Sequence, residues 1–435
     1  MLESFQNVFR IPELKRRVLF TVALLCVYRL GGHIPTPGVN SEALVSAFAS
    51  QANSLFGLYD LFVGGSFAKA TVFALGIMPY ISASIILQLL GAVIPYFEKL
   101  QKEGEEGRKK ITQYTRIGTV GLAAVQSIAF SKFLESLGAQ GVPVVPHPGP
   151  VFELMTMITQ TAGTILIMWL GEQITERGIG NGISLIIFTG IVARFPADIV
   201  NSVRALRVGT LSPIVAILMV AIMVAVIAAV VAMTQAQRKI PVQYAKRVVG
   251  RKMYGGQNTH IPLRVNTAGV IPIIFAQSVI MLPSTLALYF HGNGVIQGLA
   301  NVFAVGSVVH VVVYSVTIIF FTYFYTAIVL NPTDMADNMK KYGGFIPGIR
   351  PGRKTSEYVD RVLSRITLPG AVFLALIAVL PDILIRKFNV PFYFGGTSVL
   401  IVVGVALDTL QQMESHLLMR HYEGFVSSGK LRGRR

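Results

Sequence analysis

Apolar segments long enough to cross a bilayer recur from one end to the other of this chain of 435 residues. A helix needs about 20 apolar residues to span the hydrocarbon core of a membrane. Inside lipid the backbone must satisfy its own hydrogen bonds, which a helix does. The pattern therefore predicts an all-α membrane protein with ten transmembrane helices. The apolar segments lie near residues 18–34, 71–97, 117–134, 151–171, 183–203, 211–233, 267–290, 302–330, 366–385 and 394–411.

The composition supports a membrane protein. Charged residues make up 14% of the chain, whereas soluble proteins carry about 25%. The single cysteine, Cys26, lies inside an apolar run, which excludes an internal disulfide and any site that needs several cysteines. Residues 1–17 are basic, but no small-residue cleavage site follows the next apolar run. We interpret them as an uncleaved tail rather than a signal peptide.

The positions of the basic residues predict the topology. An even number of spans places both termini on one side, and 30 of the 38 lysines and arginines lie in the tails and loops assigned to that side. Cytoplasmic segments carry such an excess, so we expect both termini in the cytoplasm. The predicted parts are an N-tail (1–17), an N-terminal half (18–203), a C-terminal half (211–411) and a C-tail (412–435). Five spans per half would invert the second half, although internal sequence similarity is weak.

Two long loops on the predicted inner side are strongly basic. Residues 238–266 hold seven basic residues and no acidic one, and partial alternation around 242–248 followed by the sequence THIPLRV predicts a hairpin. Residues 340–354 form a turn-rich basic tip between two helical flanks. A role in setting the topology, together with contact with anionic lipid, would explain these charges without any protein or RNA partner. The length of the loops favours docking platforms for a cytoplasmic partner, whose recognised groups would be RNA phosphates or carboxylates.

Sequence motifs of soluble enzymes are absent. The chain has no HExxH and no P-loop, and GIGNG at 178–182 has the wrong spacing for dinucleotide binding. His416 and His421 lack other metal-ligating residues nearby. His310 lies inside a span, where a lone histidine is interpreted as a hydrogen-bonded packing residue. We predict no catalytic activity, cofactor or metal site.

Ionisable residues are also missing from the centres of the spans. Glu172, Asp334 and Asp408 lie at or beyond the inner span ends. Ion-coupled carriers usually place such groups near the bilayer midplane. Their absence weakens the interpretation as a small-solute transporter. It favours a passive conduit that is gated by dewetting or by moving parts.

The stretch 64–90 opens with a glycine pair and runs into an apolar segment interrupted by Gly76 and Pro79. Glycine and proline break a helix, which a membrane tolerates where protein or a water-filled cavity satisfies the freed backbone. Two interpretations follow from this stretch alone: a helix that faces a pathway through the protein, or a kinked structural span.

Five separated motifs resemble the signature stretches of the SecY family, the channel subunit of the bacterial protein-translocation complex. The resemblance covers essentially the whole chain, and the sequences of the loops and motifs resemble bacterial members rather than archaeal or eukaryotic ones. The motifs are GIMPYISASIILQLL (76–90), ERGIGNGIS (176–184), VNTAGVIPIIFAQS (265–278), KKYGGFIPGIRPG (340–352) and FYFGGTSVLIVVGVALD (392–408).

The resemblance implies two inverted five-helix halves, arranged as a clamshell around a central hourglass pore. It implies a channel that translocates unfolded secretory polypeptides across the bacterial cytoplasmic (inner) membrane and releases hydrophobic segments laterally into lipid. The implied partners are the small membrane subunits SecE and SecG, the SecA motor ATPase, the ribosome with its RNA, signal sequences, nascent polypeptides and anionic lipids.

The resemblance also places a pore ring and a plug. Isoleucine is stiff and apolar, which suits a seal that yields when helices move. Residues four apart share a helix face, and Ile191 continues the face of the fifth span, so the register there stays open. The implied ring falls on Ile77, Ile81, Ile183, Ile187, Ile274 and Ile401. The implied plug is a short helix over about 55–70, freed by the pair Gly64–Gly65, with Leu55, Phe56, Leu58, Tyr59, Leu61, Phe62 and Phe67.

Two further sets of residues follow from the resemblance. Gln88, Gln277 and Ser278 lie on spans that form the lateral gate of the family, and the two glutamines are expected to contact each other, a signal peptide, or simply neighbouring helices. Docking of SecA and the ribosome is expected on the basic loops, with Arg350 the most demanding position. Lys252 stands where the family often has arginine, so it keeps the charge but loses bidentate geometry. The docking set is Arg238, Lys246, Arg247, Arg251, Lys252, Lys340, Lys341, Arg350 and Arg353.

Overall fold

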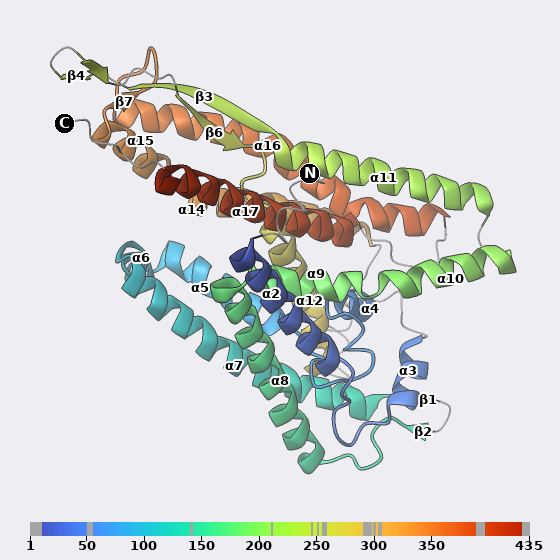
Figure 1. Cartoon of the computed structure of the whole chain (residues 1–435). Helices are drawn as coiled ribbons and strands as arrows, with labels where there is room; N and C mark the ends of the chain where they lie inside the picture. Colours follow the sequence, from blue (N-terminus) through green and yellow to red (C-terminus); the bar gives the residue numbers. More distant parts are fainter. Residues whose placement is uncertain are drawn as a thin grey trace.

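The structure is a computed structural model, in which long helices form a body and short strands form a lobe at one end (Figure 1). It describes residues 11–49, 55–139, 142–209, 212–244, 247–249, 252–254, 259–289, 298, 302, 307–388 and 396–428. The helices are α2 (Pro12–Gly31), α3 (Ser41–Ala49), α4 (Leu55–Phe62), α5 (Met78–Val93), α6 (Pro95–Lys102), α7 (Glu105–Ser136), α8 (Pro150–Arg177), α9 (Gly182–Val192), α10 (Phe195–Val208), α11 (Pro213–Gln235), α12 (Ile271–Tyr289), α14 (Val308–Val329), α15 (Pro332–Lys341), α16 (Arg353–Phe388) and α17 (Gly396–Ser428).

Each predicted apolar segment overlaps at least one of these helices. Among the described residues, six helical stretches are long and apolar enough to cross a membrane, or seven if the bent pair α5–α6 counts as one span. They are Glu105–Ser136, Pro150–Arg177, Gly182–Val208, Pro213–Gln235, Val308–Lys341 and Arg353–Leu380. Helix α2 is long enough to cross a membrane, but it is not among these six stretches because it carries one lysine and three arginines. The structure therefore supports a multi-span helical membrane protein.

The second apolar segment is interrupted at Gly76, as predicted, but not at Pro79, and it bends again farther along. Gly76 adopts a left-handed φ of +56° within the turns of residues 72–77, and α5 begins at Met78. Pro79 lies in the first helical turn, where a missing N–H removes no helix bond. The bend of 104° comes instead between Val93 and Pro95. It turns the polar, amphipathic α6 away from the direction of α5.

The fifth segment is also broken. The Asn181 side chain accepts hydrogen bonds from the backbone N–H groups of Ile183 and Ser184 and so caps α9. That helix ends at Val192, and α10 starts at Phe195 with a proline in its first turn. The short break between them therefore carries Arg194.

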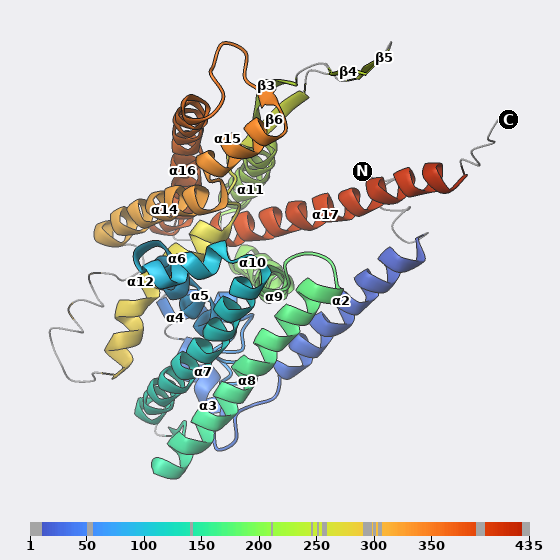
Figure 2. The ribbon, with the colours of Figure 1, turned by 90° about the vertical axis from the view of Figure 1, so that its left-hand side faces the viewer.

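Helix contacts connect two sets of neighbours. Helices α2, α5, α7, α8 and α9 pack against one another, as do α11, α12, α14, α16 and α17. Between the sets, α12 contacts α5 and α7, and α17 contacts α9. Figure 2 shows α2, α7 and α8 on one side and α14 and α16 on the other, with α17 running between them. The largest buried apolar cluster, here called the central cluster, draws residues from both sets.

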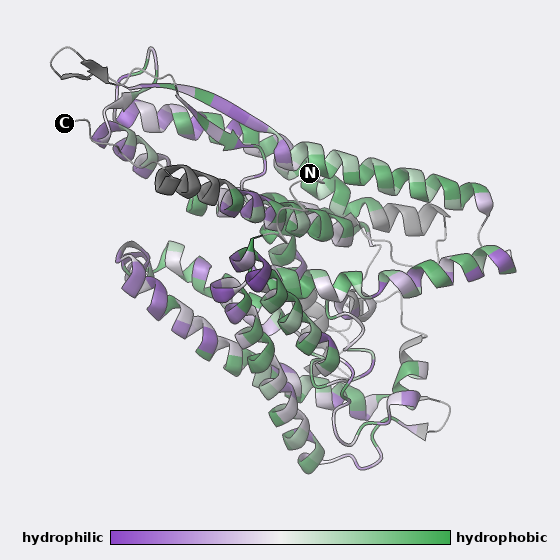
Figure 3. Ribbon diagram, viewed as in Figure 1, coloured by the Kyte–Doolittle hydropathy of each residue, from purple (hydrophilic) through white to green (hydrophobic). Residues whose placement is uncertain are grey.

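The basic lobe consists of β3 (Gln237–Tyr244), β4 (Arg247–Val249), β5 (Lys252–Tyr254), β6 (Thr259–Arg264), β7 (Gly344–Phe345), α15 and the start of α16. Strands β3 and β6 pair antiparallel with Ile240 opposite Ile261, which confirms the predicted hairpin. Helices α15 and α16 flank the turn-rich tip, as predicted. Hydrophilic residues gather on the lobe and on α6, while α11 is almost wholly apolar (Figure 3).

The second basic loop adds a strand to the first, which was not predicted. Residues Gln243 and Tyr244 of β3 pair with Phe345 and Gly344 of β7. A small apolar core lies beneath this three-stranded sheet and includes the fully buried Val242. The two loops therefore form one folded unit with its own core.

A two-stranded piece, β1 (Gly138–Ala139) with β2 (Val142–Pro143), lies with α3 at the end of the body remote from the basic lobe (Figure 1). A second apolar cluster, built around Phe67, Phe130 and Phe133, packs beneath α3. This end of the body thus has its own packed layer.

Candidate functional site

The six predicted ring isoleucines meet in the central cluster. They come from the residue before α5 and from α5, α9, α12 and α17. All except the half-buried Ile183 are buried, and Ile401 is completely so. Ile191 is as buried as Ile187, so burial does not distinguish the two registers of α9. Four helices therefore bring stiff aliphatic side chains to one place in the middle of the body.

The plug segment, residues 55–70, is only partly helical. Helix α4 ends at Phe62, and residues 63–70 form turns that include Gly64 at φ +70° and Gly65 at φ +86°. This differs from the predicted helix, because two consecutive left-handed residues cannot continue a right-handed helix. The side chains of Leu55, Phe56, Leu58 and Leu61 lie outside the described residues.

The remaining plug side chains join two apolar clusters. Phe62 belongs to the central cluster and Phe67 to the cluster beneath α3. Tyr59 packs against both, with its ring centroid 4.9 Å from that of Phe67. Phe67 in turn lies 4.9 Å from the Phe130 ring. The plug segment is thus packed between the centre of the body and the end remote from the basic lobe.

Asp60 is the only buried aspartate, glutamate, lysine or arginine among the described residues. Its Oδ2 atom lies 2.9 Å from Nη1 of Arg194, and its Oδ1 atom accepts a hydrogen bond of 2.9 Å from the backbone N–H of Ala68. Burial raises the pKa of the Asp60 carboxyl from its ordinary value, while Arg194 and the N–H groups of Ala68 and Phe67 oppose that rise.

The turn after α4 is held against two helices. Gly64 is buried, and a Cβ added to it would lie 2.8 Å from the Cα atom of Gly190 in α9. Gly65 has nothing within 4 Å of such a Cβ. The close approach of α9 therefore holds Gly64 in this arrangement, while the freedom expected of the glycine pair stays a prediction. Helix α2 donates two hydrogen bonds to the same turn, Tyr28 Oη to Val63 O at 3.4 Å and Arg29 Nη1 to Gly64 O at 3.0 Å.

The predicted gate residues lie on helices that pack together, α5 and α12. Gln88 donates to Ser84 Oγ at 3.1 Å, and Ser278 donates to Ile274 O at 2.9 Å, so both bonds stay within one helix. Gln277 is buried. Among the described residues no hydrogen bond joins Gln88 to Gln277, and Gln88 Oε1 and Gln277 Nε2 have no hydrogen-bond partner. The structure thus brings their helices together without a direct amide bond.

The docking residues that the structure describes lie on the basic lobe and its tip. Arg238, Lys340, Lys341, Arg350 and Arg353 are exposed. The Thr355 hydroxyl donates to the Arg350 carbonyl at 2.9 Å, which fixes the backbone of the tip. Lys246 and Arg251 lie outside the described residues. For Arg247 and Lys252 the structure describes only the backbone, in the short hairpin β4–β5.

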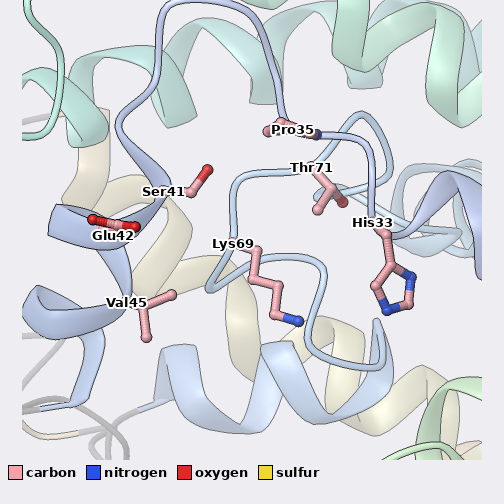
Figure 4. A pocket seen from close by; sticks show the side chains of 7 residues that line it. All are labelled: His33, Pro35, Ser41, Glu42, Val45, Lys69 and Thr71. Atoms are coloured by element: carbon pink, nitrogen blue, oxygen red, sulfur yellow. The ribbon is translucent and has the colours of Figure 1, made fainter.

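An open pocket of about 460 Å³ lies beside the plug segment. Figure 4 shows Ser41 and Glu42 of α3 on one wall, with His33 and Lys69 facing the same space from the segments that follow α2 and α4. Pro35, Val45 and Thr71 complete the lining. Within the described part of the chain, no group of three or more histidine, cysteine, aspartate or glutamate side chains could hold a metal.

These features define a class: a helical membrane protein of several spans, with an apolar centre that carries almost no formal charge and a folded basic lobe at one end. A family model named SecY matches residues 71–410. The chain therefore belongs to the SecY family.

Known proteins agree with this assignment over the whole chain. The protein translocase subunit SecY of Thermus thermophilus is 47% identical, covering 100% of both chains. That of Aquifex aeolicus is 46% identical over 98% of this chain and 100% of its own. That of Escherichia coli K12 is 46% identical over 97% of this chain and 96% of its own.

Solved structures share the fold at lower sequence identity. One, described as the structure of a protein conducting channel, has a TM-score of 0.65 at 19% identity and covers 95% of this chain and 94% of its own. Sec61 in the canine ribosome-channel complex has a TM-score of 0.61 at 18% identity, with 95% and 94% covered.

The sequence reasoning missed Asp60, Arg194 and β7. A signal for the first two was present, because each is a lone charge inside an apolar stretch and the two signs are opposite. No comparable signal marks β7, whose two residues are Gly344 and Phe345.

Proposed function

We propose that this protein is a channel that translocates unfolded secretory polypeptides across the bacterial cytoplasmic membrane and releases hydrophobic segments laterally into lipid. One observation carries the proposal: four helices bring six isoleucines into one buried cluster, in a body where Asp60 is the only buried formal charge among the described residues. The high identity to proteins named translocase subunits over the full length supports it.

The architecture proposed for this function is ten spans in two inverted five-helix halves around an hourglass pore, with both termini in the cytoplasm. The separation of helix contacts into two sets supports the two halves. Their largest contacts, α12 with α5 and α7 and α17 with α9, mark the boundary along which the halves would move.

The ring would act as an apolar seal. Water and ions are excluded from a narrow aliphatic constriction by dewetting. β-branched side chains have few rotamers, so the constriction widens mainly when helices move apart. A polypeptide could then pass without a strong binding site, as a channel that accepts every sequence requires. The plug segment would close the side remote from the basic lobe.

Lateral release would use the contact between α5 and α12. A buried amide atom without a hydrogen-bond partner costs free energy, about 1–3 kcal/mol. Gln88 Oε1 and Gln277 Nε2 are two such atoms. We propose that a signal sequence separating these helices lets both amides find partners, in the signal or in water, which lowers the cost of opening.

The proposed partners of the basic lobe are SecA and the ribosome. Exposed basic side chains on a lobe with its own core suit phosphate or carboxylate recognition. Two structural neighbours support the ribosome, since one is described as Sec61 in a ribosome-channel complex and another as an Ssh1 complex bound to the yeast 80S ribosome. SecE, SecG and anionic lipids are proposed from family membership, and the exposed apolar face of α11 leaves room for them.

Reconstitution tests the proposal. The chain is placed in vesicles with SecE and SecG, and SecA, ATP and an unfolded secretory protein with its signal are added. We expect the substrate to become protected from protease only when both motor and ATP are present. A ligand-stabilised folded version of the same substrate is the matched control and should stay accessible. Equal protection of the folded version, or none of the unfolded one, would contradict the proposal.

A further inference from the structure

We propose that Asp60 and Arg194 are positioning residues that hold the plug segment against the break between α9 and α10, and thereby set how readily the channel opens. The inference rests on the proposed function, because it assumes that the plug segment closes the pathway. It goes further by naming the chemical contact on which closure depends.

Burial makes this ion pair unlike the others that the structure describes. The Asp60 side chain is 8% exposed and that of Arg194 33%. The other described pairs have at least one member that is 49% exposed or more. Removing one partner of a buried pair leaves the other charge unpaired in a medium of low polarity. The docked state should therefore lose much of its advantage when either charge is removed.

The carboxylate joins two parts of the plug segment to the break between α9 and α10. One oxygen binds Arg194, and the other accepts from the N–H of Ala68 in the turn region. Asp60 thus ties the end of α4 to residues eight positions later and ties both to the helix break. If the pair separates, the turn and the helix lose their shared attachment.

The break in the fifth segment is what brings Arg194 to this place. Helix α9 ends at Val192, and α10 starts at Phe195, so Arg194 lies at the junction instead of within a continuous helix. On the same side, the backbone of Gly190 approaches Gly64 so closely that neither position has room for a side chain. Two independent contacts, one ionic and one steric, therefore fix the same docking surface.

The test measures ion conductance of the reconstituted complex without substrate, for Asp60→Asn, Arg194→Gln and the double variant. Each single change should raise the leak about tenfold. This lies between the small effect of breaking an exposed ion pair and the large effect of breaking a fully buried one. The double variant should leak no more than either single one, because the second change removes a charge that is already unpaired. The single variants should also export substrates with defective signals.

The matched control is Arg116→Gln, which breaks the bidentate pair of Arg116 with Glu172 between α7 and α8, at 2.9 and 2.8 Å, away from the plug segment. It should leave the leak unchanged. Additive leaks in the double variant, or a leak from Arg116→Gln as large as from Arg194→Gln, would overturn the proposal.

The same vesicles separate this proposal from the proposed function. Unaltered protein that translocates a substrate with an intact signal upholds the channel. If it does so while the Asp60 and Arg194 variants leak no more than it does, the ion pair has no positioning role and only the further inference fails. If the unaltered protein translocates nothing, the proposed function fails. Thermal unfolding of each purified variant identifies any that fail to fold, and the double variant then supplies the comparison.

Discussion

The central cluster and the basic lobe differ in side-chain type: the first buries aliphatic residues, and the second exposes basic ones. In the centre, helices from both sets bury aliphatic side chains, and among the described residues a single acidic group is buried nearby. In the lobe a small apolar core supports a sheet whose arginines and lysines are exposed. The difference fits the two proposed roles, in which the centre lets a polypeptide pass without binding it strongly and the lobe binds a cytoplasmic partner. The changes below each perturb one region and ask whether the other responds.

The largest effect is expected from Arg350→Glu in the tip of the basic lobe. Arg350 is exposed in a turn between Gly348 and Gly352, which have left-handed φ values of +80° and +102°. Reversing a charge that is presented so rigidly should abolish SecA-driven export while leaving folding and membrane insertion intact. Export into reconstituted vesicles measures it. Arg361→Glu, an exposed position on α16 outside the tip, is the control, and normal export by the Arg350 variant would remove that residue from the docking set.

Ile401→Asn should have the next largest effect, because it brings lobe-like polarity into the seal. Ile401 is completely buried in the central cluster. A buried amide without partners attracts water and costs about 1–3 kcal/mol, so the seal should loosen. We expect a higher ion leak and export of substrates with defective signals. Ile401→Val, which stays apolar and β-branched, should change neither. An unchanged leak and unchanged signal stringency in the asparagine variant would exclude Ile401 from the ring.

Gly64→Ala should raise the ion leak by a smaller amount. It tests whether the close backbone contact between Gly64 and Gly190 holds the plug segment in place. Its Cβ would meet the backbone of Gly190 at 2.8 Å, whereas Gly65→Ala would meet nothing within 4 Å. Both glycines have positive φ, so both changes carry the left-handed strain of about 1–2 kcal/mol. Only Gly64→Ala should also displace the plug segment and raise the leak. Conductance and thermal unfolding of the two variants measure this, and equal leaks would mean that the close approach to α9 does not matter.

Val242→Ala in the lobe should give the smallest and most local effect. Val242 is fully buried in the lobe core, and its truncation should destabilise the lobe by about 1–3 kcal/mol. Faster proteolysis of the lobe, with an unchanged ion leak, would show that the lobe and the central seal are independent. Lys239→Ala, exposed on the same strand, is the control. A leak that rises with Val242→Ala would instead couple the two regions.

The sequence predicted what depends on local pattern. Apolar length located the helices, and alternation with glycine turns located the β3–β6 hairpin. The interruption at Gly76 was predicted correctly, but Pro79 does not break the helix, and the sharp bend at Pro95 was not predicted. A proline in a first turn costs nothing, and the sequence alone did not show where α5 begins. The extent of the plug helix was wrong for a related reason, since two left-handed glycines end it at Phe62.

Long-range pairing could not be predicted from one sequence. Asp60 and Arg194 are 134 positions apart, and the residues around each give no indication that the two side chains pair. Likewise β7 is too short to carry a strand signal and forms because α15 and α16 bring the tip beside β3. Only the family resemblance grouped the six isoleucines. Two isoleucines four residues apart share a helix face, but that face can contact lipid as well as a pore.

The most direct test of the account is whether a polypeptide in transit passes the ring. Single cysteines at Ile81 or Ile274, in a Cys26→Ser background, are crosslinked to a secretory chain stalled during translocation. A cysteine at Ile217, which is 72% exposed on α11, is the control. We expect adducts from Ile81 and Ile274 and none from Ile217. Adducts from Ile217 alone, or none from the two ring positions while the chain is demonstrably stalled, would contradict a pathway through the central cluster.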